Sequence, residues 1–361
     1  MSFTYGVIEG LYDQLQCWNW DARSAYVDFC SRKGFDFYIY APKNDPYLRE
    51  QWRDPWPESE LERLTALSES FRKKGVRFGL GFTRYEVQQL NTQTQDALKN
   101  KLSLINTIKP DILCILFDDF KNDVPHLAQT QADIADFIAG QSNASHFQVV
   151  GTYYSKDPLL FRAYGTMPKG YWSDLGRCLD KRFDIFWTGD HVISLGYEQA
   201  GLEEMAELFQ RKPFLWDNYP VNDPGWLMCR LPVYAFTGRP WQISEWCSGH
   251  AVNPMIQPLL SMIPLTTLAD IYQQKDGYQS YAAFRVAVRE VCGEALAQAI
   301  EDNLIYLTQE GYKNFSEFTA KRLKTTFEAF SSPRDLCFSR EILHWLAKTS
   351  ETSTVPGDSS N

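Results

Sequence analysis

The sequence lacks the features of a membrane or nucleic-acid-binding protein. Among its 361 residues no run of 18 apolar residues occurs, so we expect no transmembrane helix. The net charge is −9 and the pI is about 5.2, which makes nucleic acid and anionic membranes poor partners. The first residues contain no basic segment followed by a long apolar one. We therefore expect no signal peptide and a cytoplasmic location.

Motifs for binding metals and phosphate are also lacking. None of the eight cysteines forms a CxxC pair and the five histidines are isolated, so we expect free thiols and no structural zinc. The segment Gly79-Leu80-Gly81 has no third glycine and no acidic residue downstream, which excludes a dinucleotide fingerprint. Spacing alone leaves open a metal held by carboxylates. We nevertheless predict no metal and no cofactor.

Short apolar segments alternate with amphipathic segments at intervals of roughly 35 residues, the usual size of a βα unit. Eight such units predict an α/β fold of the (β/α)8 TIM-barrel type. An open doubly wound sheet is the alternative, but it more often shows an early Gly-rich turn. The predicted strands are Phe3–Glu9, Phe35–Ala41, Val76–Phe82, Asp111–Phe117, Phe147–Tyr153, Phe183–Trp187, Phe214–Asp217 and Glu245–His250.

The intervening segments and the last third of the chain show helical periodicity. We predict helices between the strands over Ala22–Lys33, Ser59–Lys74, Thr92–Ile108, His126–Ala139 and Tyr197–Arg211, and beyond them over Ile256–Tyr272, Ser280–Leu307, Phe315–Phe330 and Arg340–Ala347. The predicted organisation is a catalytic barrel over 1–265 and a helical C-terminal extension over 266–350. The polar residues 351–361 are expected to form a disordered tail.

Two adjacent carboxylates, Asp118 and Asp119, close the most apolar predicted strand. Charges at the carboxyl end of such a strand lie where barrel enzymes keep their active sites. A helix N-cap or a surface salt bridge is the plain alternative. Aromatic residues make up 15% of the chain, which is compatible with ordinary core packing or with a ligand that stacks on rings.

Other predicted strand ends are also polar. If all of them meet at one rim, a cation, carboxylates, amides and indoles converge, which suits a neutral polyhydroxyl ligand. Adjacent carboxylates do not suit a standard retaining glycosidase, whose acid and nucleophile come from different strands. They suit a substrate that carries its own nucleophile, such as the N-acetyl group of a 2-acetamido sugar.

Six motifs in order over residues 6–255 resemble glycoside hydrolase family 84, the family of O-GlcNAcases and bacterial β-N-acetylglucosaminidases. They are Gly6-Val7-Ile8-Glu9-Gly10, Tyr38-Ile39-Tyr40-Ala41-Pro42-Lys43-Asn44-Asp45-Pro46-Tyr47, Phe117-Asp118-Asp119, Trp187-Thr188-Gly189, Trp216-Asp217-Asn218-Tyr219-Pro220-Val221-Asn222-Asp223 and Val252-Asn253-Pro254-Met255. The resemblance implies retaining, substrate-assisted hydrolysis of β-linked GlcNAc on a glycan or glycoprotein. It implies that Asp118 orients the acetamido group and that Asp119 is the general acid and base. The substrate-binding residues it implies are Gly10, Lys43, Tyr154, Trp216, Asn218, Asp223 and Asn253.

The sequence departs from the family pattern in three places. Family members usually carry Gly-Phe-Tyr-Gly where this chain has Gly10-Leu11-Tyr12-Asp13. Their Pro-Thr-Glu-Tyr is replaced by Gly151-Thr152-Tyr153-Tyr154, and their Ser-Pro-Gly by Phe82-Thr83-Arg84. These changes spare the aspartate pair and concern the leaving-group side of the groove. The alternatives are a non-hydrolytic sugar-binding protein on the same barrel, or a hydrolase of another 2-acetamido sugar such as GalNAc.

Overall fold

A computed structural model describes residues 2–11, 18–83, 87, 89–118, 124–223, 225–330 and 333–352, and only the backbone of 333–336 and 349–352. The chain divides into two compact units. The first unit comprises residues up to 219 and 238–254, and the second comprises 220–237 and the residues from 255 onwards. The domain limit expected at 265 falls inside helix α9 (Pro258–Gln274). Of the tail expected to be disordered, 353–361 lie outside the described residues.

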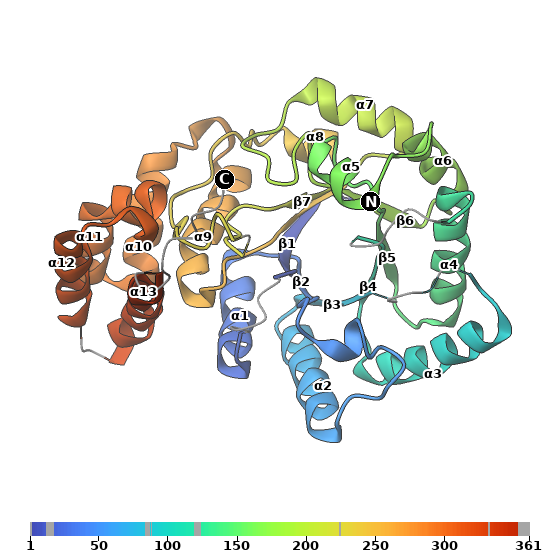
Figure 1. Cartoon of the computed structure of the whole chain (residues 1–361), viewed down its shortest axis with the longest axis horizontal. Helices are drawn as coiled ribbons and strands as arrows, with labels where there is room; N and C mark the ends of the chain where they lie inside the picture. Colours follow the sequence, from blue (N-terminus) through green and yellow to red (C-terminus); the bar gives the residue numbers. More distant parts are fainter. Residues whose placement is uncertain are drawn as a thin grey trace, which may run out of the picture. The chain divides into compact units, whose positions relative to one another are not determined.

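The first unit is a closed barrel of eight parallel strands, as the sequence predicts (Figure 1). Each strand pairs with its neighbours in the chain, and β1 pairs with β8 to close the sheet. The short, almost wholly buried strands explain the apolar runs of the sequence. They are β1 (Thr4–Glu9), β2 (Phe37–Tyr40), β3 (Arg77–Phe82), β4 (Ile112–Leu116), β5 (His146–Val150), β6 (Phe183–Trp187), β7 (Phe214–Asp217) and β8 (Gly249–Val252).

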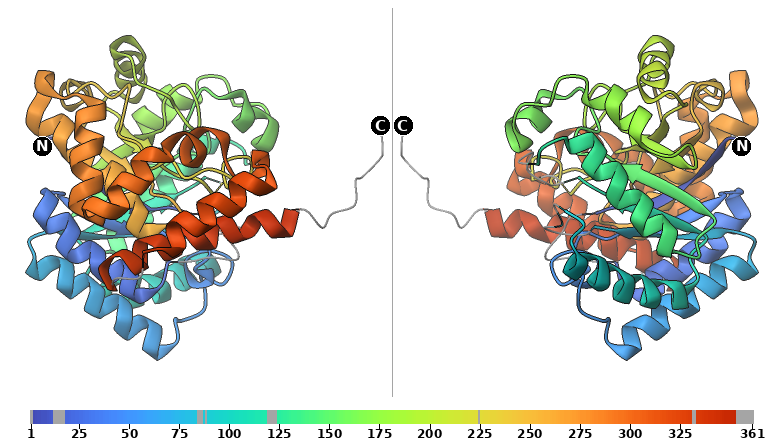
Figure 2. Two further views of the ribbon diagram at one scale, coloured as in Figure 1. Left: turned by 90° about the vertical axis from the view of Figure 1, so that its left-hand side faces the viewer. Right: turned by 90° about the vertical axis from the view of Figure 1, so that its right-hand side faces the viewer.

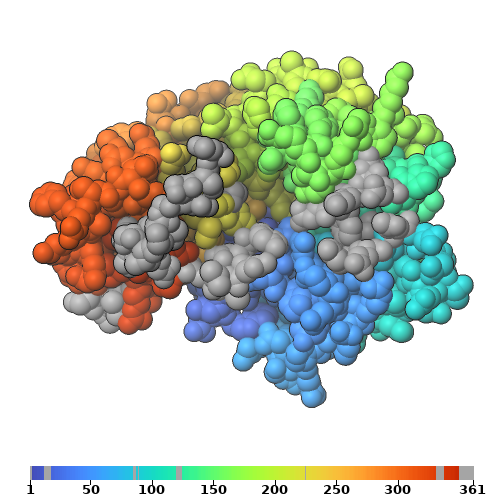
Figure 3. Space-filling view, viewed as in Figure 1, coloured from blue at the N-terminus to red at the C-terminus, as the bar shows by residue number. Residues whose placement is uncertain are grey.

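Helices surround this barrel, and the amphipathic segments of the sequence account for most of them (Figure 1). Asn19 caps α1 and Asn91 caps α3 by accepting backbone N–H groups, which fixes where these helices begin. In the space-filling view, the segment after β2 (blue) and helix α5 (green) are exposed on the face toward the viewer (Figure 3). The helices are α1 (Trp20–Lys33), α2 (Glu58–Lys73), α3 (Thr92–Ile108), α4 (Leu127–Gln141), α5 (Pro158–Tyr164), α6 (Tyr171–Cys178), α7 (Gln199–Phe209) and α8 (Ile243–Trp246), with a 3₁₀ turn η1 (Pro46–Leu48).

The predicted last strand, Glu245–His250, is wrong at its start. Its first residues end the short helix α8, in which the Cys247 N–H donates to the Ile243 carbonyl over 2.9 Å. The strand begins only at Gly249, which pairs with β1 and β7. A Cβ at Gly249 would lie 2.3 Å from the ring of Phe214, so this position requires glycine. The apolar Trp246 and Cys247 resemble strand residues in sequence but precede the register that closes the barrel.

The second unit is helical and includes the segment 220–237. Leu231, Val233 and Ala235 from that segment are buried in the same core as the helices, and the Leu231 N–H donates to the Leu307 carbonyl over 2.8 Å. The helices from α9 onwards are orange to red in Figure 2. Helix α10 packs against α9 and α11, and α12 packs against α13. They are α9, α10 (Ser280–Cys292), α11 (Glu294–Asp302), α12 (Glu317–Glu328) and α13 (Pro333–Thr352), with short turns η2 (Lys275–Gly277), η3 (Tyr306–Glu310) and η4 (Tyr312–Asn314).

The single helix predicted over Ser280–Leu307 is also wrong. Gly293, with a φ of 82°, ends α10 and starts the separate helix α11. Glycine adopts this backbone conformation without steric cost, whereas other residues rarely do. The apolar periodicity continues across the break because α10 and α11 both face the core of the second unit.

Glu341 of α13 holds the amino end of α9 within the second unit. Its carboxylate oxygens accept the N–H groups of Leu259 and Leu260 over 3.0 and 2.9 Å. Burial raises the pKa of Glu341 to about 8, although the two N–H donors act in the opposite direction.

This pKa predicts a pH-dependent stability. Because the folded state binds the Glu341 proton more tightly than the unfolded state does, its contribution is complete below about pH 4.5 and is lost as the pH rises through 8. Relative to the wild type, we expect the unfolding free energy of Glu341→Gln to rise by about 1–3 kcal/mol between pH 5 and pH 8, because the amide does not ionise. Its NH₂ group faces one of the two N–H donors, which lowers the stability equally at both pH values. Denaturant melts at both pH values test this. Glu328→Gln on the exposed face of α12 is the control, and parallel pH curves for wild type and Glu341→Gln would contradict the prediction.

No helix among the described residues has the length and apolar character needed to cross a membrane. In the same part of the chain, no three His, Cys, Asp or Glu side chains are grouped as metal ligands. The seven cysteines described form no disulfide with one another, and all but Cys178 and Cys337 are buried.

Candidate active site

The parallel strands bring most of the predicted site residues to one rim of the barrel. Since all eight strands run in the same direction, their carboxyl ends share one end of the barrel. The predicted site residues directly after or near these ends in the first unit are Gly10, Lys43, Asp118, Tyr154, Trp216, Asn218 and Asn253.

Lys43 and Asp118 form a buried ion pair at this rim. The Lys43 Nζ donates to Asp118 Oδ2, and the two residues are 8% and 7% exposed. The other carboxylate oxygen, Asp118 Oδ1, is buried and accepts no hydrogen bond from the residues that the structure describes. A buried oxygen of this kind is costly to leave without a donor. The arrangement thus holds an ionised acceptor ready for an N–H or O–H group of a ligand.

Hydrogen bonds to Asp45 hold the loop that carries Lys43. Asp45 accepts hydrogen bonds from the Tyr40 hydroxyl over 3.0 Å and from the Trp56 indole N–H over 3.2 Å. The Nζ of Lys101, on α3, lies 3.4 Å from the centre of the Trp56 ring, close enough for a cation–π contact. Burial raises the pKa of Asp45 and lowers the pKa of Lys101 to about 8. These contacts fix the start of the loop that places Lys43.

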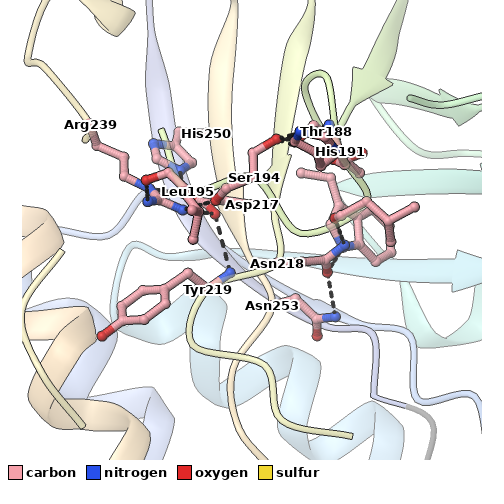
Figure 4. A network of polar contacts seen from close by, with 12 residues as sticks. Thr188, His191, Ser194, Leu195, Asp217, Asn218, Tyr219, Arg239, His250 and Asn253 are labelled. Atoms are coloured by element: carbon pink, nitrogen blue, oxygen red, sulfur yellow. Dashed lines mark hydrogen bonds and ion pairs between the residues drawn. The ribbon is translucent and has the colours of Figure 1, made fainter. Parts of the chain in front are cut away.

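A chain of amide hydrogen bonds forms a second part of the rim. Gly10 N–H donates to Asn253 Oδ1 over 3.1 Å. Asn253 Nδ2 in turn donates to Asn218 Oδ1 over 3.0 Å (Figure 4). The Trp216 Nε1–H donates to the same oxygen over 3.0 Å, and Asn218 Nδ2 donates to the Val192 carbonyl over 2.8 Å. Since an indole N–H can only donate, the atom of Asn218 that faces it must be the oxygen.

This chain of bonds leaves a defined set of groups for a ligand. Among the described residues, Asn218 and Asn253 each commit one amide N–H and keep a second. The Gly10 N–H is shared between Asn253 and the Ile8 carbonyl, which leaves the Gly10 carbonyl to bind a hydroxyl group. The rim therefore offers two amide donors and a backbone acceptor in addition to the buried Asp118 oxygen.

Gly10 and Trp216 are in close contact. A Cβ on Gly10 would lie 2.4 Å from Cζ2 of the indole, so no larger residue fits without movement. The indole ring packs edge-on against Phe186, with ring centres 5.2 Å apart, and Trp216 is 6% exposed. The indole is thereby fixed as one wall of the rim.

Three predicted site residues remain: Tyr154, Asp223 and Asp119. Tyr154 is half-buried and packs against the barrel core, and its carbonyl accepts the Thr188 N–H over 3.0 Å. Asp223 belongs to the second unit. Asp119 lies outside the described residues.

The sequence analysis does not identify one buried polar cluster next to the site. Asp217, between Trp216 and Asn218, is fully buried and forms a two-pronged ion pair with Arg239 over 2.9 and 2.8 Å. His250 Nε2 lies 3.1 Å from Asp217 Oδ2, and the carboxylate partner makes this nitrogen the protonated one. Although burial opposes ionisation, Arg239 lowers the pKa of Asp217 to about 2. No motif links Asp217 to Arg239, so no sequence signal could have found this pair.

A (β/α)8 barrel with a buried carboxylate, an ammonium group, amides and an indole at its carboxyl rim has the architecture of a barrel enzyme that binds a polar, ring-shaped substrate. Residues 5–305 match the family model described as NAGidase, beta-N-acetylglucosaminidase. The chain therefore belongs to this family of glycoside hydrolases, and the family predicted from the six motifs is confirmed.

Two curated relatives are the Protein O-GlcNAcases of Rattus norvegicus and Mus musculus. Both are 25% identical to this chain and cover 98% of it; the alignment has 382 positions for the rat protein and 386 for the mouse protein. The chain spans only 39% of the length of each relative.

Two solved structures resemble this chain closely in fold. A mutant of the Thermobaculum terrenum O-GlcNAc hydrolase has a TM-score of 0.76 and 28% identity, over 99% of this chain and 79% of that one. The structure of CpGH84B has a TM-score of 0.77 over 96% of this chain and 66% of its own; at 22% identity it supports the fold alone.

Proposed function

We propose that this chain is a retaining exo-β-N-acetylglucosaminidase that uses the 2-acetamido group of its substrate as the nucleophile. The observation that carries the proposal is the buried, unpartnered Oδ1 of Asp118 beside the charge-paired Oδ2. This oxygen has the character required to accept the acetamido N–H of a sugar. Membership of the β-N-acetylglucosaminidase family supports the same reaction.

The proposed reaction has two steps. In the first, the acetamido carbonyl oxygen attacks C1, the glycosidic C1–O bond breaks, and Asp119 donates its proton to the leaving oxygen. Asp118 accepts the N–H hydrogen bond and stabilises the positive charge that develops on the oxazolinium ring. In the second, Asp119 takes a proton from water as the water attacks C1 and the ring opens. Two inversions at C1 give overall retention.

The groups left over in the rim support recognition of the sugar. The second N–H groups of Asn218 and Asn253 are suited to hydroxyl oxygens, and the Gly10 carbonyl is suited to a hydroxyl hydrogen. In this proposal Lys43 also contacts a hydroxyl group, Trp216 walls the N-acetyl pocket, and Tyr154 donates to the acetamide oxygen. Asp223 and Asp119 keep the roles that the family resemblance implies.

Substrates with a progressively fluorinated N-acetyl group test the mechanism. Fluorine withdraws electrons from the carbonyl oxygen, so we expect kcat/KM for the 4-methylumbelliferyl conjugates to fall by about tenfold or more with each fluorine, because the nucleophile weakens in the rate-limiting step. Release of 4-methylumbelliferone is the measurement. A rate independent of fluorination would contradict substrate assistance even if the enzyme were active.

The leaving group and the sugar need separate tests. The names of the relatives support GlcNAc attached to protein as the substrate, and release of GlcNAc from a modified peptide compared with a free glycan tests this. The GlcNAc and GalNAc conjugates compared at equal concentration test the alternative sugar. Binding of GlcNAc in calorimetry without turnover of any conjugate would favour the sugar-binding alternative.

A further inference from the structure

The amide of Asn218 depends on a loop that lies mostly beyond the predicted motif Trp187-Thr188-Gly189. This loop joins β6 to α7, and its Val192 carbonyl accepts one Asn218 amide N–H. Inside the loop, the Ser194 hydroxyl donates to the Thr188 carbonyl over 2.9 Å. The loop is also held from outside, because the Val192 N–H donates over 3.1 Å to Oδ2 of Asp157, which lies before α5. Anything that moves this loop changes the direction of the remaining Asn218 N–H.

Arg239 joins the loop to the end of β7. Its Nη1 donates to the Leu195 carbonyl over 2.6 Å and its Nη2 to the Ser194 carbonyl over 2.8 Å. The same guanidinium group bonds both oxygens of Asp217, the residue directly before Asn218 (Figure 4). The arginine side chain is 3% exposed and that of Asp217 is fully buried. The Arg239 guanidinium group therefore bonds both the loop that holds the Asn218 amide and Asp217, the residue before Asn218.

We propose that Arg239, through Asp217 and the loop residues Ser194 and Leu195, is a positioning residue that aims the free amide N–H of Asn218 at the substrate. The proposal rests on the proposed function for the nature of that substrate, but its geometry does not. Arg239 does not touch the ligand in this proposal. It acts by holding the Val192 carbonyl in register with the end of β7.

Lysine is the informative replacement for Arg239, because it keeps the positive charge but lacks the planar guanidinium group. An ammonium group cannot bond Asp217 at two points and two loop carbonyls in the same plane. Since Asn218 contributes binding that is similar in ground and transition states, we expect Arg239→Lys to raise KM for the 4-methylumbelliferyl β-GlcNAc conjugate about tenfold, with kcat within about threefold.

Arg211→Lys is the matched control. Like Arg239, Arg211 donates several hydrogen bonds from one guanidinium group, but its partners lie at the opposite end of the barrel. They are the backbone carbonyls of Gly176, Leu179, Asp180, Phe183 and Phe209. We expect this variant to lose stability without a change in KM. An equal rise of KM in both variants would mean that Arg239 has only a general structural role, and would overturn the proposal.

A double-mutant cycle tests whether Arg239 acts through Asn218. In the Asn218→Ala background, Arg239→Lys is expected to raise KM by less than about twofold, because the group that it aims is already gone. Multiplicative effects of the two substitutions would overturn the proposal. If Arg239→Lys does not fold, Ser194→Ala is the substitute, because it removes only the hydroxyl's bonds to Thr188 and His191 inside the loop. It is expected to raise KM to a smaller extent with the same dependence on Asn218.

Hydrogen exchange separates this inference from the proposed function. We expect Arg239→Lys to speed amide exchange in peptides covering 188–195, and Arg211→Lys to leave these peptides unchanged. If the wild type neither binds nor hydrolyses the conjugate, the proposed function fails, and exchange alone decides whether Arg239 holds the loop. Unchanged exchange in 188–195 would overturn the inference even in an active enzyme.

Discussion

Asp118→Asn is expected to lower kcat for the 4-methylumbelliferyl β-GlcNAc conjugate by about 10²–10³-fold, with a much smaller change in KM. In the wild type one oxygen of Asp118 pairs with Lys43 and the other is buried without a donor. Asparagine can keep its oxygen toward Lys43, but it then turns its NH₂ toward the acetamido N–H. Two donors face each other, and the negative charge that stabilises the oxazolinium ring is lost.

Asp111→Asn is the matched control for this prediction. Asp111 lies just before the same strand, β4, at its opposite end, and its Oδ2 accepts the Phe78 N–H over 3.0 Å. We expect a small loss of stability and unchanged kcat. Initial rates over a range of substrate concentrations, with circular dichroism to verify folding, give the comparison. If Asp118→Asn keeps kcat within about threefold of the wild type, Asp118 does not have the proposed role.

Asp119→Asn is expected to behave differently from Asp118→Asn. A general acid matters most for a poor leaving group, so its loss should slow a glycan substrate far more than an aryl conjugate. Kinetics on both substrates measure this difference. Equal losses on the two substrates would argue against Asp119 as the acid.

The barrel is predictable from sequence because strand burial leaves a strong local signal. Strands such as β4, which is wholly buried, read as apolar runs bounded by polar residues. The start of β8 could not be predicted in this way, since it depends on pairing between Gly249 and Thr4, at the other end of the barrel sequence. The break at Gly293 was signalled only by a single glycine inside a periodic pattern, which helices often tolerate.

The candidate site, like the fold, has features that the sequence predicts and others that it does not. Strand ends predict which residues reach the rim, because a closed parallel barrel collects them whatever the details of packing. They do not predict which polar atoms are already engaged. The bond to Asn253 occupies the Gly10 N–H. The bond from Trp216 occupies the Asn218 oxygen, so Asn218 can only donate to a ligand. The role of Arg239 arises from loop geometry, which sequence periodicity does not encode.

Gly10→Ala is the second substitution with a large expected effect. The added methyl group would lie 2.4 Å from Cζ2 and 3.1 Å from Cη2 of Trp216. The indole cannot retreat easily, because it packs on Phe186 and donates to Asn218. We expect a loss of about 1–3 kcal/mol in stability from overpacking. Displacement of Trp216 and Asn218 should also lower kcat/KM about 10²-fold, since misplacement of about 1 Å can have this effect.

Two further variants make the Gly10 prediction specific. Gly201→Ala in α7 places its methyl group in open space, so it should stabilise the helix by about 0.5–1 kcal/mol without affecting kcat/KM. Trp216→Phe shortens the ring that the new Cβ meets, and so in the Gly10→Ala background it should restore part of the lost stability. It should not restore activity, because phenylalanine has no N–H to hold Asn218. Thermal melts and conjugate hydrolysis measure both properties, and a Gly10→Ala enzyme with wild-type kcat/KM would show that the glycine–indole contact does not shape the site.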